Sequence, residues 1–192
     1  MQDKKLSWCF GIKDGLRIVE PNKRLSDLYL KEAKSSLKRA EKDFEDNDLL
    51  WSTVVIYYAD YYALYSFLQK IGVNCEIHSC SISAVGFLLG DDKINVVNQH
   101  KEKRIDAQYY IKIGKEAQVK QILKEAKLFV SLFDEIVSNI TNNEIEKYRS
   151  ELKKIALKKK FKELSEEIQK KFRKHKISKN DLDQAIKNAR KK

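Results

Sequence analysis

The distribution of helix-breaking residues constrains the fold of this chain more than any other feature. The 192 residues include a single proline, Pro21, and six glycines, of which the last is Gly114. Everything after Gly114 therefore lacks the two residues that most often interrupt a helix. Apolar residues make up 42% of the chain, which is enough for a hydrophobic core. Together these features predict an all-α protein.

The net charge of +11 is concentrated at the C-terminal end. Residues 144–192 hold 18 basic and 8 acidic residues, whereas residues 1–143 are nearly balanced, with 21 and 20. This asymmetry indicates a separate basic module that either attracts polyanions or stays solvated. We predict three parts: a lead-in over residues 1–24, a helical bundle over residues 25–143 and a basic helical arm over residues 144–192.

Apolar periodicity predicts the individual helices. The run from Leu49 to Ile71 is apolar nearly all round, which is typical of the buried central helix of a bundle. Its tyrosine stripe is expected to pack in the core with hydroxyls at a rim or interface. The stripe consists of Tyr58, Tyr61, Tyr62 and Tyr65. Asp60, the lone acid of this run, is expected to reach the surface or to pair with a basic residue, because burying it unpaired is costly.

The remaining helices are predicted from the same periodicity and from their caps. Residues 25–44 form an amphipathic helix, residues 91–113 form one helix after a short helix ending near Gly90, and residues 115–140 give the most regular amphipathic pattern. The predicted caps are Ser26, the segment EDND at 45–48, and the capping boxes Thr141 with Glu144 and Ser178 with Asp181.

The three cysteines, Cys9, Cys75 and Cys80, are odd in number and poorly spaced for a disulfide framework, which favours a reducing compartment. Cys75, His78 and Cys80 resemble metal ligands, but they have no fourth partner and no paired CxxC units. Buried or loop cysteines are the simpler interpretation, so we predict no metal and no cofactor.

No apolar run of about 18 residues predicts a membrane span, and the N-terminus lacks the apolar core of a signal peptide. We therefore expect a cytoplasmic protein.

Residues 100–111, HKEKRIDAQYYI, gather the candidate functional residues. His100 and Arg104 are one helical turn apart and share a face, and Tyr109 lies near the same side and is expected to point inward. A cation beside a phenol and a potential base suits contact with phosphate, although a solvated helix face gives the same pattern. The catalytic candidates are Arg104, Tyr109, His100 and Asp106, and the nucleotide- or RNA-binding candidates are Arg104, Lys101, Lys103 and Tyr110.

Five segments in this order resemble the HEPN domain family, in particular its small archaeal and bacterial members. They are SWCFGIKDGLRIVEPNKRLSDLYLKEAKSSLKRA (7–40), STVVIYYADYYALYSFLQKIG (52–72), HSCSISAVGFLL (78–89), KRIDAQYY (103–110) and KEAKLFVSLFDEI (124–136). The resemblance covers about three-quarters of the chain and leaves the basic arm outside. It implies an up-and-down bundle of four to five helices that dimerises. The dimer would place two copies of the segment KRIDAQYY, which contains Arg104, at one cleft.

The resemblance also implies two functions. Many members are metal-independent ribonucleases, often toxins paired with a small nucleotidyltransferase antitoxin, and carry an arginine followed four to six residues later by histidine. In this chain Tyr109 stands five residues after Arg104, at the histidine position. A phenol with an ordinary pKa of about 10 is a poor base for cleavage through the RNA 2′-hydroxyl. Three alternatives follow: His100 acts as the base in place of the missing histidine, Tyr109 only positions the phosphate, or the chain does not cut RNA. Asp106 is expected to orient the guanidinium of Arg104.

Three functional hypotheses follow. The chain is the partner of a minimal nucleotidyltransferase in a toxin–antitoxin-type pair, with Tyr109 or Tyr110 as an acceptor for a nucleotidyl group; or it is a ribonuclease toxin; or it is a non-catalytic helical interaction module. In each case a homodimer and a cytoplasmic setting are expected. The arm is expected to lay its apolar stripe, from Ile145 to Phe172, into a groove of a partner protein, with nucleic-acid affinity as a secondary effect.

Overall fold

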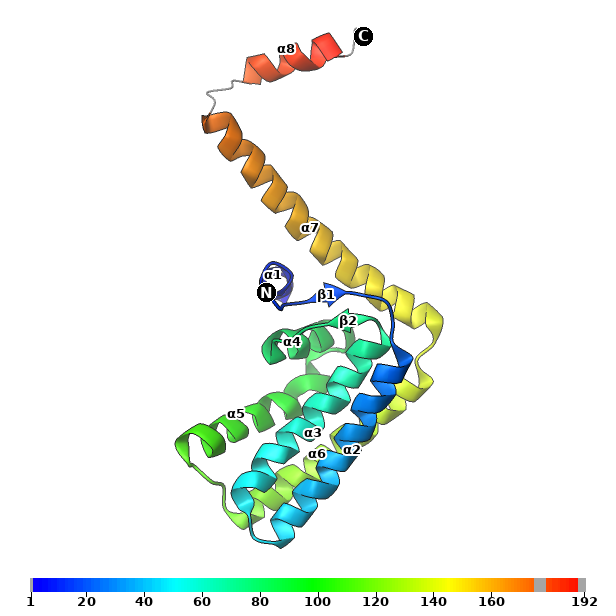
Figure 1. Ribbon diagram of the computed structural model, residues 1–192, viewed down its shortest axis with the longest axis vertical. Helices are drawn as coiled ribbons and strands as arrows, with labels where there is room; N and C mark the ends of the chain where they lie inside the picture. The colour runs from blue at the N-terminus through cyan, green and yellow to red at the C-terminus, as the bar shows by residue number, and fades with distance from the viewer. Residues whose placement is uncertain (1, 175–178, 190–192) are drawn as a thin grey trace.

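The computed structural model of the protein describes residues 2–174 and 179–189, and it is helical over almost all of them (Figure 1). The prediction of an all-α bundle is confirmed. The elements in chain order are α1 (Gln2–Cys9), β1 (Arg17–Ile18), α2 (Lys23–Glu45), α3 (Leu49–Lys70), β2 (Val73–Asn74), α4 (His78–Leu89), the 3₁₀ turn η1 (Asp91–Ile94), α5 (Asn95–Tyr110), α6 (Glu116–Asn139), α7 (Asn142–Lys174) and α8 (Lys179–Ala189).

Helix α3 is the centre of the bundle, as its uniformly apolar sequence predicts. It packs against α2, α6 and α5, and these four helices run up and down beside one another (Figure 1). Its buried large side chains include Tyr57, Leu64, Phe67 and Leu68, which lie on several faces because neighbours surround the helix. Burial of this apolar surface is the main driving force for the fold.

The helix ends agree with the sequence in part. Asp48 accepts a hydrogen bond from the backbone N–H of Trp51, and Thr141 and Glu144 form the predicted capping box, so both expectations are confirmed. The cap predicted at Ser26 is wrong, because α2 begins earlier and the side chain of Asn22 caps it by accepting from Leu25 N–H. The box predicted at Ser178 lies outside the described residues.

The lead-in is held to the bundle by a short ribbon and a covalent bond. Strand β1 pairs antiparallel with β2, and Cys9 at the end of α1 forms a disulfide with Cys80 in α4. The Cα atoms of this pair are 5.7 Å apart although 71 residues separate them in sequence. The expectation of unpaired cysteines is therefore wrong for Cys9 and Cys80, and Cys75 is a buried free thiol.

Helix α7 extends the chain away from the bundle (Figure 1). Its first half packs on the body through Ile145, Leu152 and Ile155, which are all buried. Beyond them the apolar side chains of Leu157, Phe161 and Leu164 are more than half exposed. Among the helices of residues 2–174 and 179–189, none is both long and apolar enough to cross a membrane.

Candidate functional site

Helix α5 distributes the predicted site residues over three different surroundings. His100 is completely buried against α3 and α6, Arg104 faces tyrosines of α3, and Lys103 and Asp106 line a pocket beside α6. The structure therefore does not bring His100 and Arg104 into one site, even though they are one helical turn apart. The reason is that Asp60 binds the imidazole of His100 in the interior.

Three tyrosine rings lie around the guanidinium of Arg104, whose side chain is half-buried. Its Nη2 donates a hydrogen bond of 3.0 Å to the Tyr58 hydroxyl. Its guanidinium carbon lies 5.6 Å from the ring centres of both Tyr57 and Tyr58 and 5.4 Å from that of Tyr109. These are cation–π distances, and the tyrosines stabilise the guanidinium without neutralising it.

The positive charge of Arg104 has no carboxylate partner within ion-pair distance in the described part of the chain. Asp106 does not make the predicted contact with the guanidinium; the Tyr58 hydroxyl orients it instead. Burial works against the charge, but the Tyr58 hydrogen bond and the neighbouring phenols outweigh it, so the pKa of Arg104 is raised. Its Nε is buried and lacks a hydrogen-bond partner among the described residues. Arg104 thus keeps a charge that no carboxylate compensates within the part of the chain that the structure describes.

His78, at the start of α4, lies beside Arg104 and its tyrosines. The sequence indicated only a possible metal ligand at this position. Its Nδ1 is 2.6 Å from the Tyr57 hydroxyl, and its ring stacks on Tyr61 with centres 3.7 Å apart. Burial, and then the charges of Arg104 and Lys101, lower the pKa of His78 to about 4. The imidazole is therefore neutral at pH 7, beside a fixed cation. We call Arg104, Tyr57, Tyr58, His78 and Tyr109 the arginine cluster.

His100 belongs to a buried polar network instead. Its Nδ1 is 2.6 Å from a carboxylate oxygen of Asp60, and its Nε2 is 3.2 Å from Glu125. Asp60 and His100 are both 0% exposed, so Asp60 pairs with a basic residue, as predicted, but does not reach the surface. Burial raises the pKa of Asp60 to about 6. For His100 burial opposes the charge, but the two carboxylates outweigh it and raise its pKa.

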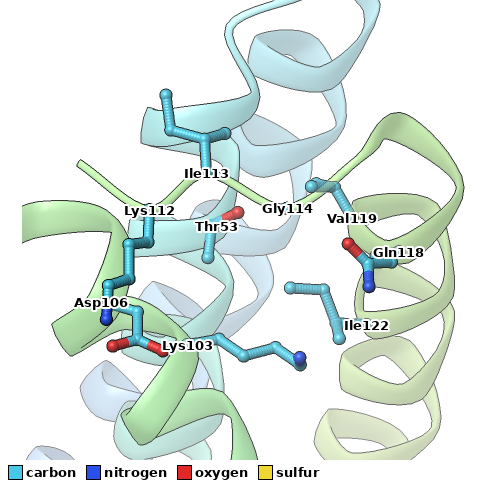
Figure 2. A pocket seen from close by; sticks show the side chains of 9 residues that line it. All are labelled: Thr53, Lys103, Asp106, Lys112, Ile113, Gly114, Gln118, Val119 and Ile122. Atoms are coloured by element: carbon cyan, nitrogen blue, oxygen red, sulfur yellow. The ribbon is translucent and has the colours of Figure 1, made fainter. Parts of the chain in front are cut away.

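A pocket on the other side of α5 collects Lys103 and Asp106 (Figure 2). The loop after α5 and the first turns of α6 close it, with Thr53 of α3 at its floor. Its remaining lining residues are Lys112, Ile113, Gly114, Gln118, Val119 and Ile122. Its volume of about 220 Å³ is below the range of about 300–1,000 Å³ usual for small-molecule sites. Lys103 and Asp106 line this pocket and Arg104 does not, so the two groups of predicted site residues lie on different sides of α5.

The end of α5 exposes a group of large apolar side chains next to the arginine cluster. Tyr109, Tyr110 and Ile111 are 63%, 64% and 67% exposed, so the expectation that Tyr109 points inward is wrong. Tyr110 contacts Lys112, whose ammonium lies 5.5 Å from the ring centre. Ile111 has a left-handed backbone with φ of 54°, which is unfavourable for a β-branched residue. This residue ends α5 as its C-cap, where its backbone N–H and that of Lys112 both donate to the carbonyl oxygen of Asp106.

Two of the three residues considered as zinc ligands make other contacts, and the third, Cys75, is a buried free thiol. Cys80 is disulfide-bonded to Cys9, and the Nδ1 of His78 contacts Tyr57. Within residues 2–174 and 179–189, no three His, Cys, Asp or Glu side chains converge as a metal site would require.

Comparison with protein families agrees with this architecture. The family model described as the HEPN domain matches residues 26–137, which is more than half of the chain and runs from α2 to the end of α6. The chain belongs to the HEPN domain family. No curated protein matches it. The HEPN match contains the arginine cluster and the Asp60–His100 pair, whereas α1 and α7 lie outside it.

Proposed function

We propose that this HEPN protein is the partner of a minimal nucleotidyltransferase in a toxin–antitoxin-type pair, and that its arginine cluster receives the phosphate of a nucleotide or RNA. The observation that carries the proposal is the uncompensated charge of Arg104 inside a ring of tyrosines. A guanidinium recognises phosphate through two parallel hydrogen bonds, and aromatic rings beside it offer stacking surfaces to bases. A coenzyme is not required for this role.

A homodimer would complete the site. Tyr109, Tyr110, Ile111 and Ile113 form an exposed apolar run adjoining Arg104. The C-cap conformation of Ile111 turns the chain out of α5 and leaves its side chain 67% exposed beside the tyrosines. A second copy covering this run would place two arginine clusters on one cleft.

Replacing Arg104 with alanine is expected to weaken RNA binding roughly 10- to 100-fold, which corresponds to losing one or two charge-assisted hydrogen bonds. Fluorescence anisotropy with a labelled single-stranded RNA at fixed salt measures the change. The control is Arg39→Ala, which removes the same charge from an exposed position on α2. Equal weakening by the two substitutions would mean that Arg104 contributes only net charge.

The partner role predicts covalent modification of Tyr109. In the step proposed, the phenol oxygen attacks the α-phosphorus of a nucleoside triphosphate bound by the nucleotidyltransferase, pyrophosphate leaves, and the phenol proton passes to solvent. The Tyr109 ring lies against Arg104, which stabilises the charge of the incoming phosphate, whereas Tyr110 lies against Lys112. Intact mass after co-expression should show added nucleotide in the parent and in Tyr110→Phe but not in Tyr109→Phe. Loss in Tyr110→Phe alone would move the acceptor to Tyr110.

His78 favours a second candidate function, metal-independent RNA cleavage. Its neutral imidazole lies in the arginine cluster, where the sequence left the base unassigned. The RNA 2′-hydroxyl would attack the adjacent phosphorus and give its proton to His78, while the 5′-oxygen leaves and is protonated by water. A pKa of about 4 makes His78 a weak base, but a phosphate beside Arg104 offsets one of the charges that lower it. RNA incubated with the protein in EDTA should then acquire 2′,3′-cyclic phosphate ends that both His78→Ala and Arg104→Ala abolish. Cleavage that survives either substitution excludes this candidate.

A further inference from the structure

We propose that a groove between α1 and α7 binds single-stranded nucleic acid and continues the path of a strand that starts at the arginine cluster. The groove lies outside the residues that match the HEPN model. Lys4, Ser7 and Trp8 of α1 form one wall, and Ile155, Lys158, Lys159 and Lys162 of α7 form the other. Its volume of about 580 Å³ is within the range of about 300–1,000 Å³ usual for ligand sites.

The composition of the groove matches what single strands require. Sequence-tolerant binding combines a positively charged groove for the backbone with aromatic rings on which bases stack. Trp8 is 54% exposed at the wall, and Ile155 is 7% exposed. The indole of Trp8, half exposed beside the lysines, is therefore a surface on which a base can stack, and Ile155 forms the apolar part of the opposite wall.

The charge of the groove is only partly compensated. Lys159 pairs with Glu163 at 3.0 Å, and Lys162 lies 3.9 Å from Glu166. Lys4 and Lys158 have no carboxylate within ion-pair distance in the described part of the chain. The groove thus keeps net positive charge, which favours phosphates.

Cationic side chains connect this groove with the arginine cluster. Lys101 lies on α5 one turn before Arg104. Lys5 follows Lys4 in the sequence of α1 but lines a separate pocket with Asp91 and Asn98. Burial lowers the pKa of Lys101 most, and the charges of Lys5 and then of Arg104 lower it further, which places both cations near Lys101. The disulfide between Cys9 and Cys80 fixes α1 on α4, which begins with His78 of the arginine cluster. In the path proposed, a strand bound at Arg104 would meet Lys101 and Lys5, and would then cross α1 to reach Lys4 in the groove.

The groove's own binding is independent of Arg104, whereas the continuous path rests on the proposed function. An acidic protein segment is the competing occupant. Single-stranded nucleic acid is favoured because the exposed indole sits within the lysine-lined groove and the connected arginine cluster also combines a cation with aromatic rings.

Fluorescence of Trp8 tests the proposal directly. In Trp51→Phe protein Trp8 is the sole tryptophan. Oligouridine of about 20 nucleotides should quench it, and Lys4→Ala/Lys158→Ala should weaken that binding roughly 10-fold. The matched control is Lys31→Ala/Lys38→Ala, which removes two exposed lysines from α2. Equal weakening by the control, absence of quenching, or equal quenching by poly-glutamate would overturn the groove as a nucleic-acid site.

Arg104→Ala separates the two proposals. Quenching of Trp8 that persists while total RNA affinity falls supports both sites. If RNA affinity does not fall but quenching persists, the proposed function fails and the groove stands alone. If affinity falls in Arg104→Ala and the two groove lysines have no effect, the groove proposal fails and the proposed function stands.

Discussion

Asp60→Ala is expected to lower the free energy of unfolding by about 3–5 kcal/mol, because it leaves a buried histidine without its carboxylate. Asp60 and His100 are fully buried, and the distance of 2.6 Å between them is that of a strong hydrogen bond. Glu125 contacts the other ring nitrogen but is partly exposed, so it cannot replace Asp60. Urea denaturation followed by circular dichroism at pH 7 measures the loss.

The control for Asp60 is an aspartate in an exposed ion pair. Asp134 pairs with Lys34 at 2.7 Å, and both side chains are at least one-third exposed. Such pairs contribute about 0–1 kcal/mol, so Asp134→Ala should change stability little. A loss in Asp60→Ala no greater than that in Asp134→Ala would contradict the interpretation of the buried pair.

The pair also sets a pH dependence with a definite sign. The folded-state pKa of His100 is raised above about 6.5, so the stability it contributes is complete below that pH and is lost as pH rises through its folded pKa. The pKa of Asp60 is raised from 3.8 to about 6, so the folded state also binds this proton more tightly, and stability falls as pH rises across that interval. The double variant Asp60→Asn/His100→Gln should therefore show a smaller decline than the parent between about pH 4 and pH 8. A steeper decline in the variant would reverse the assignment.

The functional consequence is that the buried pair fixes the helix that carries Arg104. His100 precedes Arg104 by one turn of α5, and Asp60 follows Tyr58 on α3. The pair therefore sets the register between the helices whose side chains form the Arg104–Tyr58 hydrogen bond. A displaced α5 would move Arg104 away from Tyr58 although no residue of the arginine cluster had been replaced.

The features predicted from sequence are those set by local patterns. The scarcity of proline and glycine, the apolar run of α3 and the amphipathic run of α6 specify helices through backbone propensity and periodicity, which neighbouring residues determine. Arg104 was found as a candidate because its neighbours along one helix include His100 and Tyr109.

The features missed are contacts between distant segments. His78 precedes Arg104 by 26 residues and Asp60 precedes His100 by 40, so no periodic pattern connects them. The helical spacing of His100 and Arg104 placed them on one face, but the burial of Asp60 drew the imidazole into the interior. The signal that was present was chemical: an acid within an apolar helix requires a basic partner, and the chain offers only three histidines.

Arg149 joins the arm to the body, and its replacement by methionine is expected to cost roughly 3 kcal/mol of stability. The side chain is 6% exposed, and its Nη1 donates to the carbonyl oxygens of Val19 at 2.7 Å and Ile71 at 2.9 Å. Methionine fills similar space but leaves both acceptors buried without a donor. Gly72 belongs to the same junction, since a Cβ there would lie 2.2 Å from Nη1.

The matched control is Arg173→Met, which removes an exposed arginine near the other end of α7. Chemical denaturation should show the loss only for Arg149→Met, and limited proteolysis should then cut α7 near its start. This outcome bears on the groove as well, because α7 supplies one of its walls through Ile155 and Lys158, less than three turns beyond Arg149. Arg149→Met protein that remains folded should therefore lose quenching of Trp8 by oligouridine while the fluorescence anisotropy change assigned to Arg104 persists. Loss of both signals in folded protein would instead show that the arm and the bundle bind RNA as one inseparable surface.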